Sequence, residues 1–310
     1  MPDHGPHALK GIKALTFDVF GTVVDWRRPV EAALSAALRP SGRNGLLRRR
    51  RSATTEDEAA EMAEAEARAG SLTDADVAAL AQEWRDSYKR FTRGFHPGVD
   101  RWKDVDAHHR DSLVRMLRRH GLLGVLVHDE GTTTSSSSSS SIQELSLVWH
   151  RLTPWPDSAD GLRALGSGGS GEAGGGPGRP GPGLGLVTAT LSNGNRALLQ
   201  DLDAFGGLGF GRLLSAEDFG AYKPDPRVYL GAAERLGLGP GEVAMVAAHL
   251  GDLDAARRLG LRTVYVERDG EEDWEVGGER YEAAKGWVDL WVGLDEGGFV
   301  EVARRLRDVI

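Results

Sequence analysis

The pattern of apolar and polar positions changes character twice along the 310 residues of the chain. An apolar run at residues 12–18 (IKALTFD) has the length and composition of a buried β-strand. From about residue 28 to residue 153, apolar residues recur at spacings of three and four, the period of an amphipathic helix. From residue 184 onwards, short apolar runs alternate with helical stretches. The pattern therefore predicts one strand, then a helical block, then an alternating strand–helix region.

The helical block contains three stretches with clear helix signals. Residues 73–91 begin with a threonine–aspartate pair, and both residue types cap helices. Residues 106–122 show the same period and reach a glycine, which commonly follows a helix end. Residues 141–155 form a third predicted helix, which Pro154 should end because proline cannot continue helical hydrogen bonding.

The region after residue 184 predicts a parallel sheet. Its strand-like stretches are 184–194, 212–220, 242–252, 262–268 and 288–293. An amphipathic helix at 298–310 closes the region. Strands that alternate with helices indicate an α/β fold with a doubly wound parallel sheet. The helical block after the first strand then predicts an inserted helical cap domain. We place the core domain at 11–27 and 156–310 and the cap domain at 28–155.

Three stretches of biased composition interrupt this pattern. They hold a serine run, many of the 42 glycines, and a basic cluster followed by an acidic, alanine-rich run. Such stretches bury too little apolar surface to order themselves, so we expect disordered inserts near 42–70, 131–141 and 166–183. The basic cluster is read either as a solvated loop or as a nuclear localisation signal.

Composition narrows the classes of function. The formal net charge of −8 argues against binding nucleic acid by overall charge. The chain has no cysteine, which excludes disulfides, thiolate metal sites and a cysteine nucleophile. It shows no apolar run long enough for a signal peptide or a membrane span. We therefore expect a cytoplasmic protein that acts on a small-molecule substrate, without nucleic-acid or membrane partners.

Polar residues stand at the ends of three predicted strands. Asp18 ends the first strand, Ser192 and Asn193 end the second, and His249 to Asp252 end a third. In doubly wound sheets, ligands bind at the carboxyl ends of the strands, near the point where strand order reverses. Asp18 alone would be read as a turn residue or a helix cap. The convergence of three strand ends makes it a candidate catalytic residue.

Four motifs in order resemble those of the haloacid dehalogenase superfamily. They are Asp18 followed by Gly21-Thr22, LSNG at 191–194, Lys223 in YKPDPRVY, and Asp252 in VAAHLGDLDAARRLG. The resemblance spans both core segments and implies a Rossmann-like core with a helical cap. That architecture agrees with the one predicted from the apolar pattern.

Two positions argue against the phosphatases that dominate this superfamily. Those enzymes carry a second aspartate two residues after the nucleophile, where this chain has Phe20, which cannot donate a proton. They also hold Mg²⁺ with an acidic pair four residues apart. Here Ala248 stands in place of one member and only Asp252 remains, which leaves a hard cation short of oxygen ligands.

Further residues resemble the L-2-haloacid dehalogenase branch. That branch has an aromatic residue where Phe20 stands and works without metal or other cofactor. It carries a Trp-Arg pair followed closely by Tyr in the first cap helix, and an Arg-Leu pair shortly before a proline at the cap end. The matching residues here are Trp84, Arg85, Tyr88, Arg151, Leu152 and Pro154, together with 222–229.

The resemblance implies a hydrolytic dehalogenation with three catalytic residues. Asp18 would displace halide from C2 of a 2-halo carboxylic acid and form an ester. Lys223 would keep Asp18 ionised, although outside this motif it would be read as a surface residue. Asp252, acting directly or through Lys223, would activate the water that hydrolyses the ester. A helix cap is the structural alternative for Asp252.

The remaining candidates would bind substrate. Three short polar residues can hydrogen-bond the attacking carboxylate or the substrate carboxylate, namely Thr22, Ser192 and Asn193. Residues of these types are also common in turns, so each could be an ordinary turn residue. Arg85 would bind the substrate carboxylate or the departing halide. Phe20 and Tyr229 would line the pocket, unless they serve only in core packing.

The third strand end departs from the branch pattern. The branch has Ser and Asn where this chain has Ala247 and His249, and Trp where it has Gly251. His249 would make the hydrogen bond that the asparagine side chain makes in the branch, or it would add a titrating group to the site. A third interpretation is that His249 is a polar residue without a role in catalysis.

Two other functions stay open at the level of sequence. One is a Mg²⁺-dependent phosphatase or another hydrolase of a small acid, and the other is a relative that keeps the fold without catalysis. Relatives also pair through the cap, so a homodimer is an expected assembly.

Overall fold

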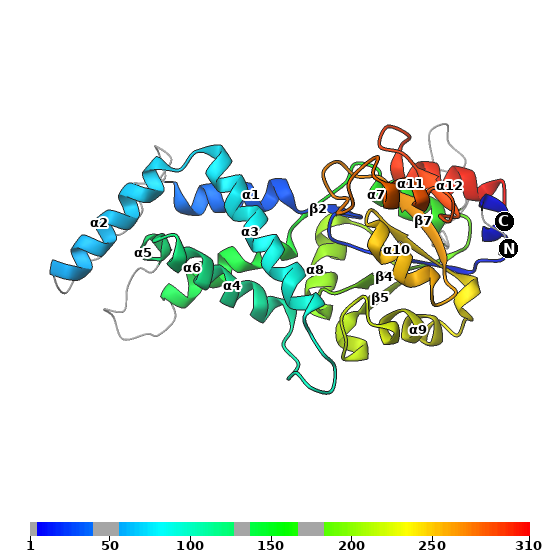
Figure 1. The fold of residues 1–310 in the computed structure, drawn as a ribbon, viewed down its shortest axis with the longest axis horizontal. Coiled ribbons are helices and arrows are strands. Elements are labelled where there is room, and N and C mark those ends of the chain that lie inside the picture. The colour runs from blue at the N-terminus through cyan, green and yellow to red at the C-terminus, as the bar shows by residue number, and fades with distance from the viewer. Residues whose placement is uncertain (1–4, 40–55, 127–136, 167–182) are drawn as a thin grey trace. The chain divides into compact units, whose positions relative to one another are not determined.

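A computed structural model describes residues 5–39, 56–126, 137–166 and 183–310. Its contacts divide the chain into two units (Figure 1). The core unit comprises residues 1–25, 95–102 and 153–310, and the helical unit comprises residues 26–94 and 103–152. None of the helices in the described part of the chain is both long and apolar enough to cross a bilayer.

A six-stranded parallel sheet forms the centre of the core unit. Its spatial order is β5-β4-β1-β6-β7-β8. The strands are β1 (Ala14–Phe17), β4 (Val187–Ser192), β5 (Arg212–Ser215), β6 (Val243–Ala247), β7 (Arg262–Val266) and β8 (Leu290–Val292). The chain moves from β1 outward through β4 to β5, then returns to the other side of β1. This order confirms the predicted doubly wound α/β fold.

Strand β1 lies in the middle of the sheet because its residues suit burial on both faces. All four are buried, and Ala14 is opposite both Val187 and Val243. A continuous apolar run is typical of a parallel strand covered on both sides.

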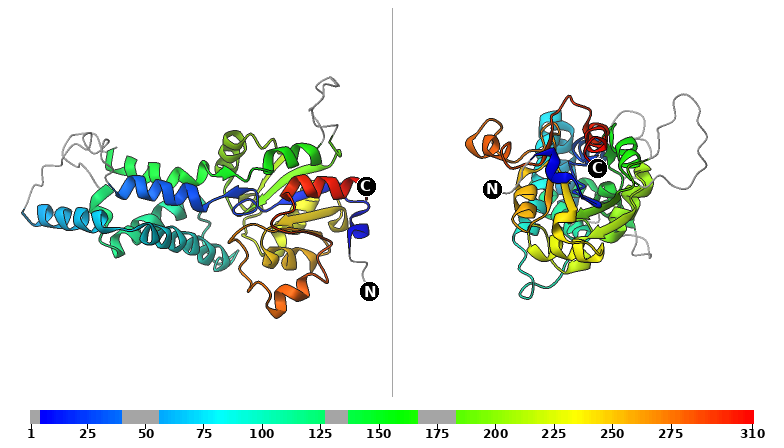
Figure 2. Two further views of the ribbon diagram at one scale, coloured as in Figure 1. Left: turned by 90° about the horizontal axis from the view of Figure 1, so that it is seen from above. Right: turned by 90° about the vertical axis from the view of Figure 1, so that its right-hand side faces the viewer.

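Helices cover both faces of the sheet (Figure 2). Residues of α9, α10 and α11 share one apolar cluster with the sheet. On the other face, the ring of Phe17 meets that of Phe299 on α12 edge-to-face at 5.2 Å, and α7 lies beside α12. The helices are α7 (Ser158–Leu165), α8 (Arg196–Gly206), α9 (Pro226–Arg235), α10 (Leu250–Arg257), α11 (Glu279–Ala284) and α12 (Gly298–Arg307).

Buried tryptophans form the centre of the helical unit. The ring of Trp149 lies 5.4 Å from that of Trp84 and 6.1 Å from that of Trp26. Thr73 caps α3 with a reciprocal pair of hydrogen bonds to Asp76, as the threonine at this point of the sequence suggests. The helices are α1 (Arg27–Leu38), α2 (Glu56–Ser71), α3 (Asp74–Arg93), α4 (Val105–Arg119), α5 (Leu123–Leu126) and α6 (Ser137–Ser146).

The structure corrects the prediction of a disordered insert at 42–70. Its second half forms α2, because alanine and glutamate are strong helix formers and because Ala65 and Ala69 find apolar neighbours and are buried. Residues 40–55 lie outside the described part of the chain. Most of the inserts predicted at 131–141 and 166–183 also lie outside it.

Two boundaries of the cap domain also differ from prediction. The helix expected at 141–155 ends early, and β3 (Thr153–Pro154) pairs with β2 (Val24–Asp25) instead. Proline lacks an N–H and is tolerated in so short an edge pairing. Residues 95–102 group with the core unit, where Trp102 stacks on Tyr222 at 4.8 Å.

Candidate active site

The site lies in the core unit at the carboxyl ends of adjacent strands. Asp18 directly follows β1, Ser192 ends β4, and His249 lies two residues after β6. Since β4 and β6 are the two neighbours of β1, all three chain segments reach the same edge of the sheet. This is the point at which strand order reverses, where ligands bind in such folds.

Asp18 is held as a carboxylate by three side chains. Its Oδ1 lies 3.0 Å from Nζ of Lys223. Its Oδ2 lies 2.9 Å from the hydroxyl of Thr22 and 3.0 Å from Nδ1 of His249. Burial alone would raise the pKa of Asp18, but the charges and hydrogen bonds of Lys223 and His249 outweigh burial and hold this pKa well below its usual range.

Lys223 connects the two acidic residues of the site. Its Nζ lies 3.0 Å from Oδ1 of Asp18 and 2.5 Å from Oδ2 of Asp252. Burial opposes its charge, yet the two carboxylates raise its pKa above the ordinary value. The side-chain amide of Asn193 accepts a hydrogen bond from the Lys223 N–H at 2.7 Å and donates one to its carbonyl. Asn193 therefore holds the segment that carries the lysine, and these hydrogen bonds go to the Lys223 backbone, not to the Asp18 carboxylate.

Asp252 has a different environment from Asp18. Its Oδ1 accepts a hydrogen bond from the Tyr229 hydroxyl at 2.5 Å. Burial is the largest influence on the pKa of Asp252 and raises it. The positive charge of Lys223 lowers this pKa and the negative charge of Asp18 raises it further, so the pKa of Asp252 lies above its ordinary value. Asp252 lies in the first turn of α10, whose N-cap is His249, so it is not the cap that the sequence allowed.

The two hydroxyl groups of the site have different partners. The Thr22 hydroxyl oxygen accepts the Ala248 N–H at 2.9 Å, so its own proton is free to point to Asp18. The hydroxyl oxygen of Ser192 instead accepts the Gly194 N–H at 3.1 Å. Thr22 therefore contacts the Asp18 carboxylate, whereas Ser192 organises the turn after β4.

Two further candidates are buried aromatic or cationic residues. Phe20 is almost fully buried in the core unit. Arg85 belongs to the helical unit, where it is 3% exposed and its guanidinium lies 4.9 Å from the ring centre of Tyr88 and 5.5 Å from that of Trp26. Arg85 is thus a buried arginine within an aromatic cluster, unlike most helix arginines.

Glu271 is a site residue that the sequence reading missed. It lies in the loop after β7, is 5% exposed, and places Oε2 at 3.6 Å from Nε2 of His249. The neighbouring Glu272 accepts the Leu250 N–H at the start of α10 at 2.8 Å. The signal was present, because this pair of glutamates follows another strand that ends at the same edge of the sheet.

A buried ion pair supports the loop that carries Thr22. Nη1 and Nη2 of Arg268 lie 2.6 and 2.8 Å from the two carboxylate oxygens of Asp157. Nε of Arg268 donates to the Thr22 carbonyl at 3.1 Å. Burial opposes the charge of Asp157, but Arg268 outweighs it and lowers the pKa of this aspartate.

Replacing Asp157 with Asn should lower the free energy of unfolding by about 3 kcal/mol or more, because Arg268 would stay buried without its partner charge. Since the pKa of Asp157 is lowered on folding, its contribution is full above the ordinary value of 3.8 and is lost as pH falls through the folded-state value. Urea unfolding at neutral pH and at acid pH measures both effects.

The matched control is Asp160→Asn on α7, the helix that Asp157 precedes, because the exposed ion pair of Asp160 with Arg163 should contribute at most about 1 kcal/mol. Equal losses in the two variants would contradict the role of the Asp157–Arg268 pair.

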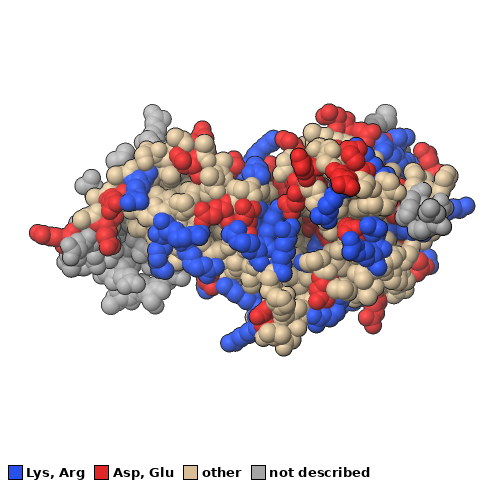
Figure 3. All heavy atoms as spheres, in the orientation of Figure 1, with Lys and Arg blue, Asp and Glu red and all other residues tan. Residues whose placement is uncertain are grey.

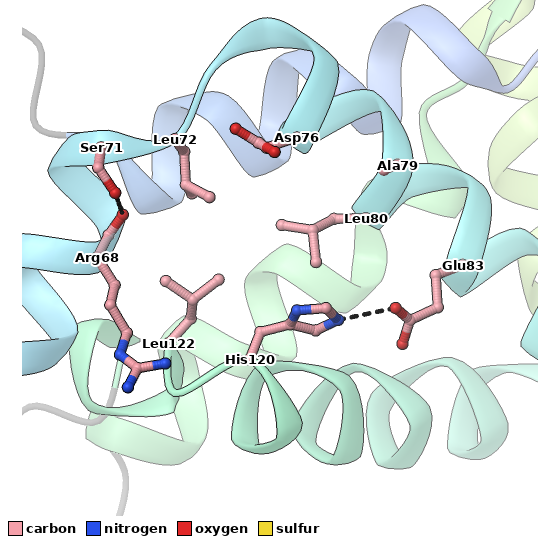
Figure 4. Close-up of a pocket in the computed structure, with 9 residues that line it drawn as sticks. All are labelled: Arg68, Ser71, Leu72, Asp76, Ala79, Leu80, Glu83, His120 and Leu122. Carbon is pink, nitrogen blue, oxygen red and sulfur yellow. Dashed lines mark hydrogen bonds and ion pairs between the residues drawn. The ribbon is translucent and has the colours of Figure 1, made fainter.

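Two pockets are lined by described residues of the helical unit. One is lined by α2, α3 and the end of α4, and the His120 ring and the Glu83 carboxylate form a hydrogen bond there (Figure 4). The other is lined by α3 and α4, where Lys and Arg side chains gather on the surface (Figure 3). Neither pocket includes a residue of the Asp18 cluster, so we assign neither to the reaction.

The site residues do not suit a divalent metal. Across the described ranges, no three His, Asp or Glu side chains are grouped so that they could hold a metal ion. The side chains of Phe20 and Ala248 supply no oxygen ligand, and the ammonium of Lys223 already bridges Asp18 and Asp252. We therefore derive no step through a metal.

Comparison with known proteins identifies the family of the chain. The family model for haloacid dehalogenase-like hydrolases matches residues 12–260. A curated relative, (S)-2-haloacid dehalogenase 4A of Burkholderia cepacia, is 35% identical over 132 residues, covering 41% of this chain and 48% of the relative. The chain thus spans about half the length of the curated relatives it matches.

Solved structures cover more of the chain. A defluorinating L-2-haloacid dehalogenase is 29% identical with a TM-score of 0.66, covering 99% of this chain and 100% of that one. Another L-2-haloacid dehalogenase is 31% identical with a TM-score of 0.65, covering 96% and 100%. With its doubly wound sheet, its Asp18 cluster and the extent of the family match, the chain belongs to the haloacid dehalogenase-like hydrolase family. The resemblance noted in the sequence is thereby confirmed.

Proposed function

We propose that the protein is a metal-independent hydrolase that converts small 2-halo carboxylic acids and water into 2-hydroxy acids and halide. The observation that carries this proposal is the ionised Asp18, which contacts Lys223, Thr22 and His249 while position 20 holds phenylalanine. The names of the relatives described above support the same reaction class.

The first step is an in-line displacement at C2 of the substrate. Oδ1 of Asp18 forms a bond to C2 as the carbon–halogen bond breaks, and the halide leaves with the bonding electron pair. Lys223 keeps the carboxylate charged by proximity, and burial keeps it poorly solvated. Arg85 stays a prediction as the residue that binds the substrate carboxylate or the halide.

The second step hydrolyses the ester. A water oxygen attacks Cγ of Asp18 and passes its proton to Asp252, whose raised pKa suits a base. The Cγ–Oδ1 bond then breaks, and Lys223 gives a proton to the departing hydroxy acid and regains one from Asp252. The second proton of the water leaves the Asp18 carboxyl for the solvent, which restores the carboxylate. The 2.5 Å contact between Nζ of Lys223 and Oδ2 of Asp252 supports this proton path.

The test is halide release from L-2-chloropropionate by the purified protein in excess chelator. We expect sustained release that added Mg²⁺ does not increase. The phosphatase alternative predicts hydrolysis of an aryl phosphate that needs Mg²⁺ and stops with chelator. Inactivity towards both compounds would favour a relative without catalysis, and release that depends on metal would contradict the proposed mechanism.

The setting of the reaction is also part of the proposal. We place the protein in the cytoplasm, acting on a small acid without nucleic-acid or membrane partners and with a homodimer as the expected assembly. The absence of cysteine and the net charge of −8 support the first two statements. Gel filtration of the purified chain tests the third.

A further inference from the structure

We propose that Thr22 and His249 form the site that binds the negative oxygen of Asp18 during ester hydrolysis, and that Glu271 is the positioning residue that holds His249 there. This inference rests on the proposed function. It concerns the second step only, and it assigns a role to the His249–Glu271 pair.

Two donors converge on one oxygen of Asp18. The Thr22 hydroxyl lies 2.9 Å from Oδ2, and Nδ1 of His249 lies 3.0 Å from it. Because the Thr22 oxygen already accepts the Ala248 N–H, its proton points to Oδ2. A carboxylate only accepts hydrogen bonds, so Nδ1 of His249 must carry a proton as well. Both donors are therefore oriented before any substrate binds.

The opposite oxygen of Asp18 has fewer hydrogen-bond partners, and we assign the attack to it. Oδ1 contacts Nζ of Lys223, whereas Oδ2 already accepts two hydrogen bonds. When Oδ1 bonds to the substrate, Oδ2 becomes the carbonyl oxygen of the ester. Water attack at Cγ then places a full negative charge on Oδ2. Donors aimed at that oxygen stabilise the tetrahedral intermediate. When the Cγ–Oδ1 bond breaks, its electron pair leaves with the oxygen of the hydroxy acid, and Asp18 regains its charge by losing the remaining proton of the water.

Glu271 faces the far side of the His249 ring. Its Oε2 lies 3.6 Å from Nε2 of His249, and both side chains are buried. The approach requires glycine at position 21, where φ is +85° and an added Cβ would lie 2.0 Å from Oε2 of Glu271. The ring thus lies between two carboxylates, one on each nitrogen, which favours the doubly protonated, charged form.

The charged groups around His249 agree with this assignment. Burial lowers the pKa of His249, but Asp18 and Glu271 outweigh it and raise this pKa to about 9. Three other charged groups lie near the His249 ring or near its partner Asp18. They are Glu272 in the loop after β7, Lys223, which contacts Asp18, and Asp252 in the first turn of α10. Ester formation removes the charge of Asp18, so the pKa of His249 in the ester state should lie below 9, and Glu271 becomes the main group that keeps the ring charged.

The experiment measures the two steps separately in Glu271→Gln and His249→Ala. Rapid quench with L-2-chloropropionate gives the halide burst, and intact mass after acid quench gives the fraction of protein carrying the ester. We expect a normal burst in Glu271→Gln, with ester hydrolysis slowed about tenfold, since one unit of pKa corresponds to a factor of ten. In His249→Ala the loss of one donor should slow hydrolysis about 100-fold or more. Ester should accumulate in both variants.

The pH profile separates positioning from a purely structural role. In the native protein, ester hydrolysis should fall as pH rises through the ester-state pKa of His249. In Glu271→Gln that midpoint should move to lower pH by about one unit, and in His249→Asn, which keeps a neutral donor, it should disappear. Glu275→Gln, an exposed residue of the same loop, is the matched control and should behave as the native protein.

Each outcome decides the inference. Halide release by the native protein with no ester accumulation in either variant, or an unchanged midpoint in Glu271→Gln, overturns the roles of His249 and Glu271 alone. Absence of halide release from the native protein, both in a burst and in the steady state, overturns the proposed function, and this inference with it.

Discussion

Asp18→Asn should remove halide release, with kcat lowered by about 10⁴-fold or more, because the attacking group is lost. Asparagine has nearly the shape of aspartate but carries no charge. Its amide oxygen cannot displace halide at a useful rate, and no ester can form. Both the halide burst and the mass increase of the covalent intermediate should vanish, so rapid quench and intact mass spectrometry measure the effect.

The fold of this variant needs its own measurement, since Asp18 also neutralises Lys223 and His249. Circular dichroism and thermal unfolding should report a folded protein, because Asp252 still pairs with Lys223 and Glu271 with His249. Asp295→Asn, on an exposed turn of the core unit, is the matched control. A folded Asp18→Asn protein that keeps its activity would exclude the aspartyl-ester mechanism.

Lys223→Met should be the second most damaging change, with kcat/KM lowered by about 10³-fold. Methionine keeps the length of the side chain and removes its charge. Two buried carboxylates, Asp18 and Asp252, would then repel each other without the cation that now lies between them. Their pKa values should rise, so one of them would hold a proton at neutral pH. Both ester formation and its hydrolysis should slow.

The sign of the pH effect identifies the cause. In Lys223→Met, residual activity should increase with pH as the acidic pair loses its proton, whereas the native protein should keep Asp18 ionised throughout the neutral range. Lys13→Met, which removes an exposed lysine paired with Glu242, is the matched control and should leave the profile unchanged. A residual rate independent of pH would contradict the proposed coupling between the three groups.

The positions of the strand ends could be predicted from the sequence, whereas the helix α2 within the 42–70 insert could not. Asp18, Thr22 and the Asp252 segment follow short apolar runs, and the rule that parallel strands share one carboxyl edge brings them together without further information. The α2 helix was missed because its neighbours in sequence look disordered, whereas Ala65 and Ala69 become buried only through tertiary contact.

The roles of side chains depended on three-dimensional detail. Asn193 looked like a ligand for a carboxylate, yet both of its amide atoms bond to the backbone of Lys223. Glu271 carries no motif, and its approach to His249 depends on the missing side chain of Gly21. The strand-end rule places Glu271 at the correct edge of the sheet, but its pairing with His249 joins loops that lie far apart in the chain, so local pattern could not predict the contact.

The central position of β1 in the sheet also affects when activity appears during folding. Asp18 meets Lys223 across 205 residues of chain and His249 across 231, so the reacting groups come together only through long-range pairing. Closing loops of that length costs entropy before any contact forms, and folds rich in such contacts fold slowly. In a refolding experiment, helical signal should therefore return well before the site can form an ester, and recovered activity would report the last stage of assembly.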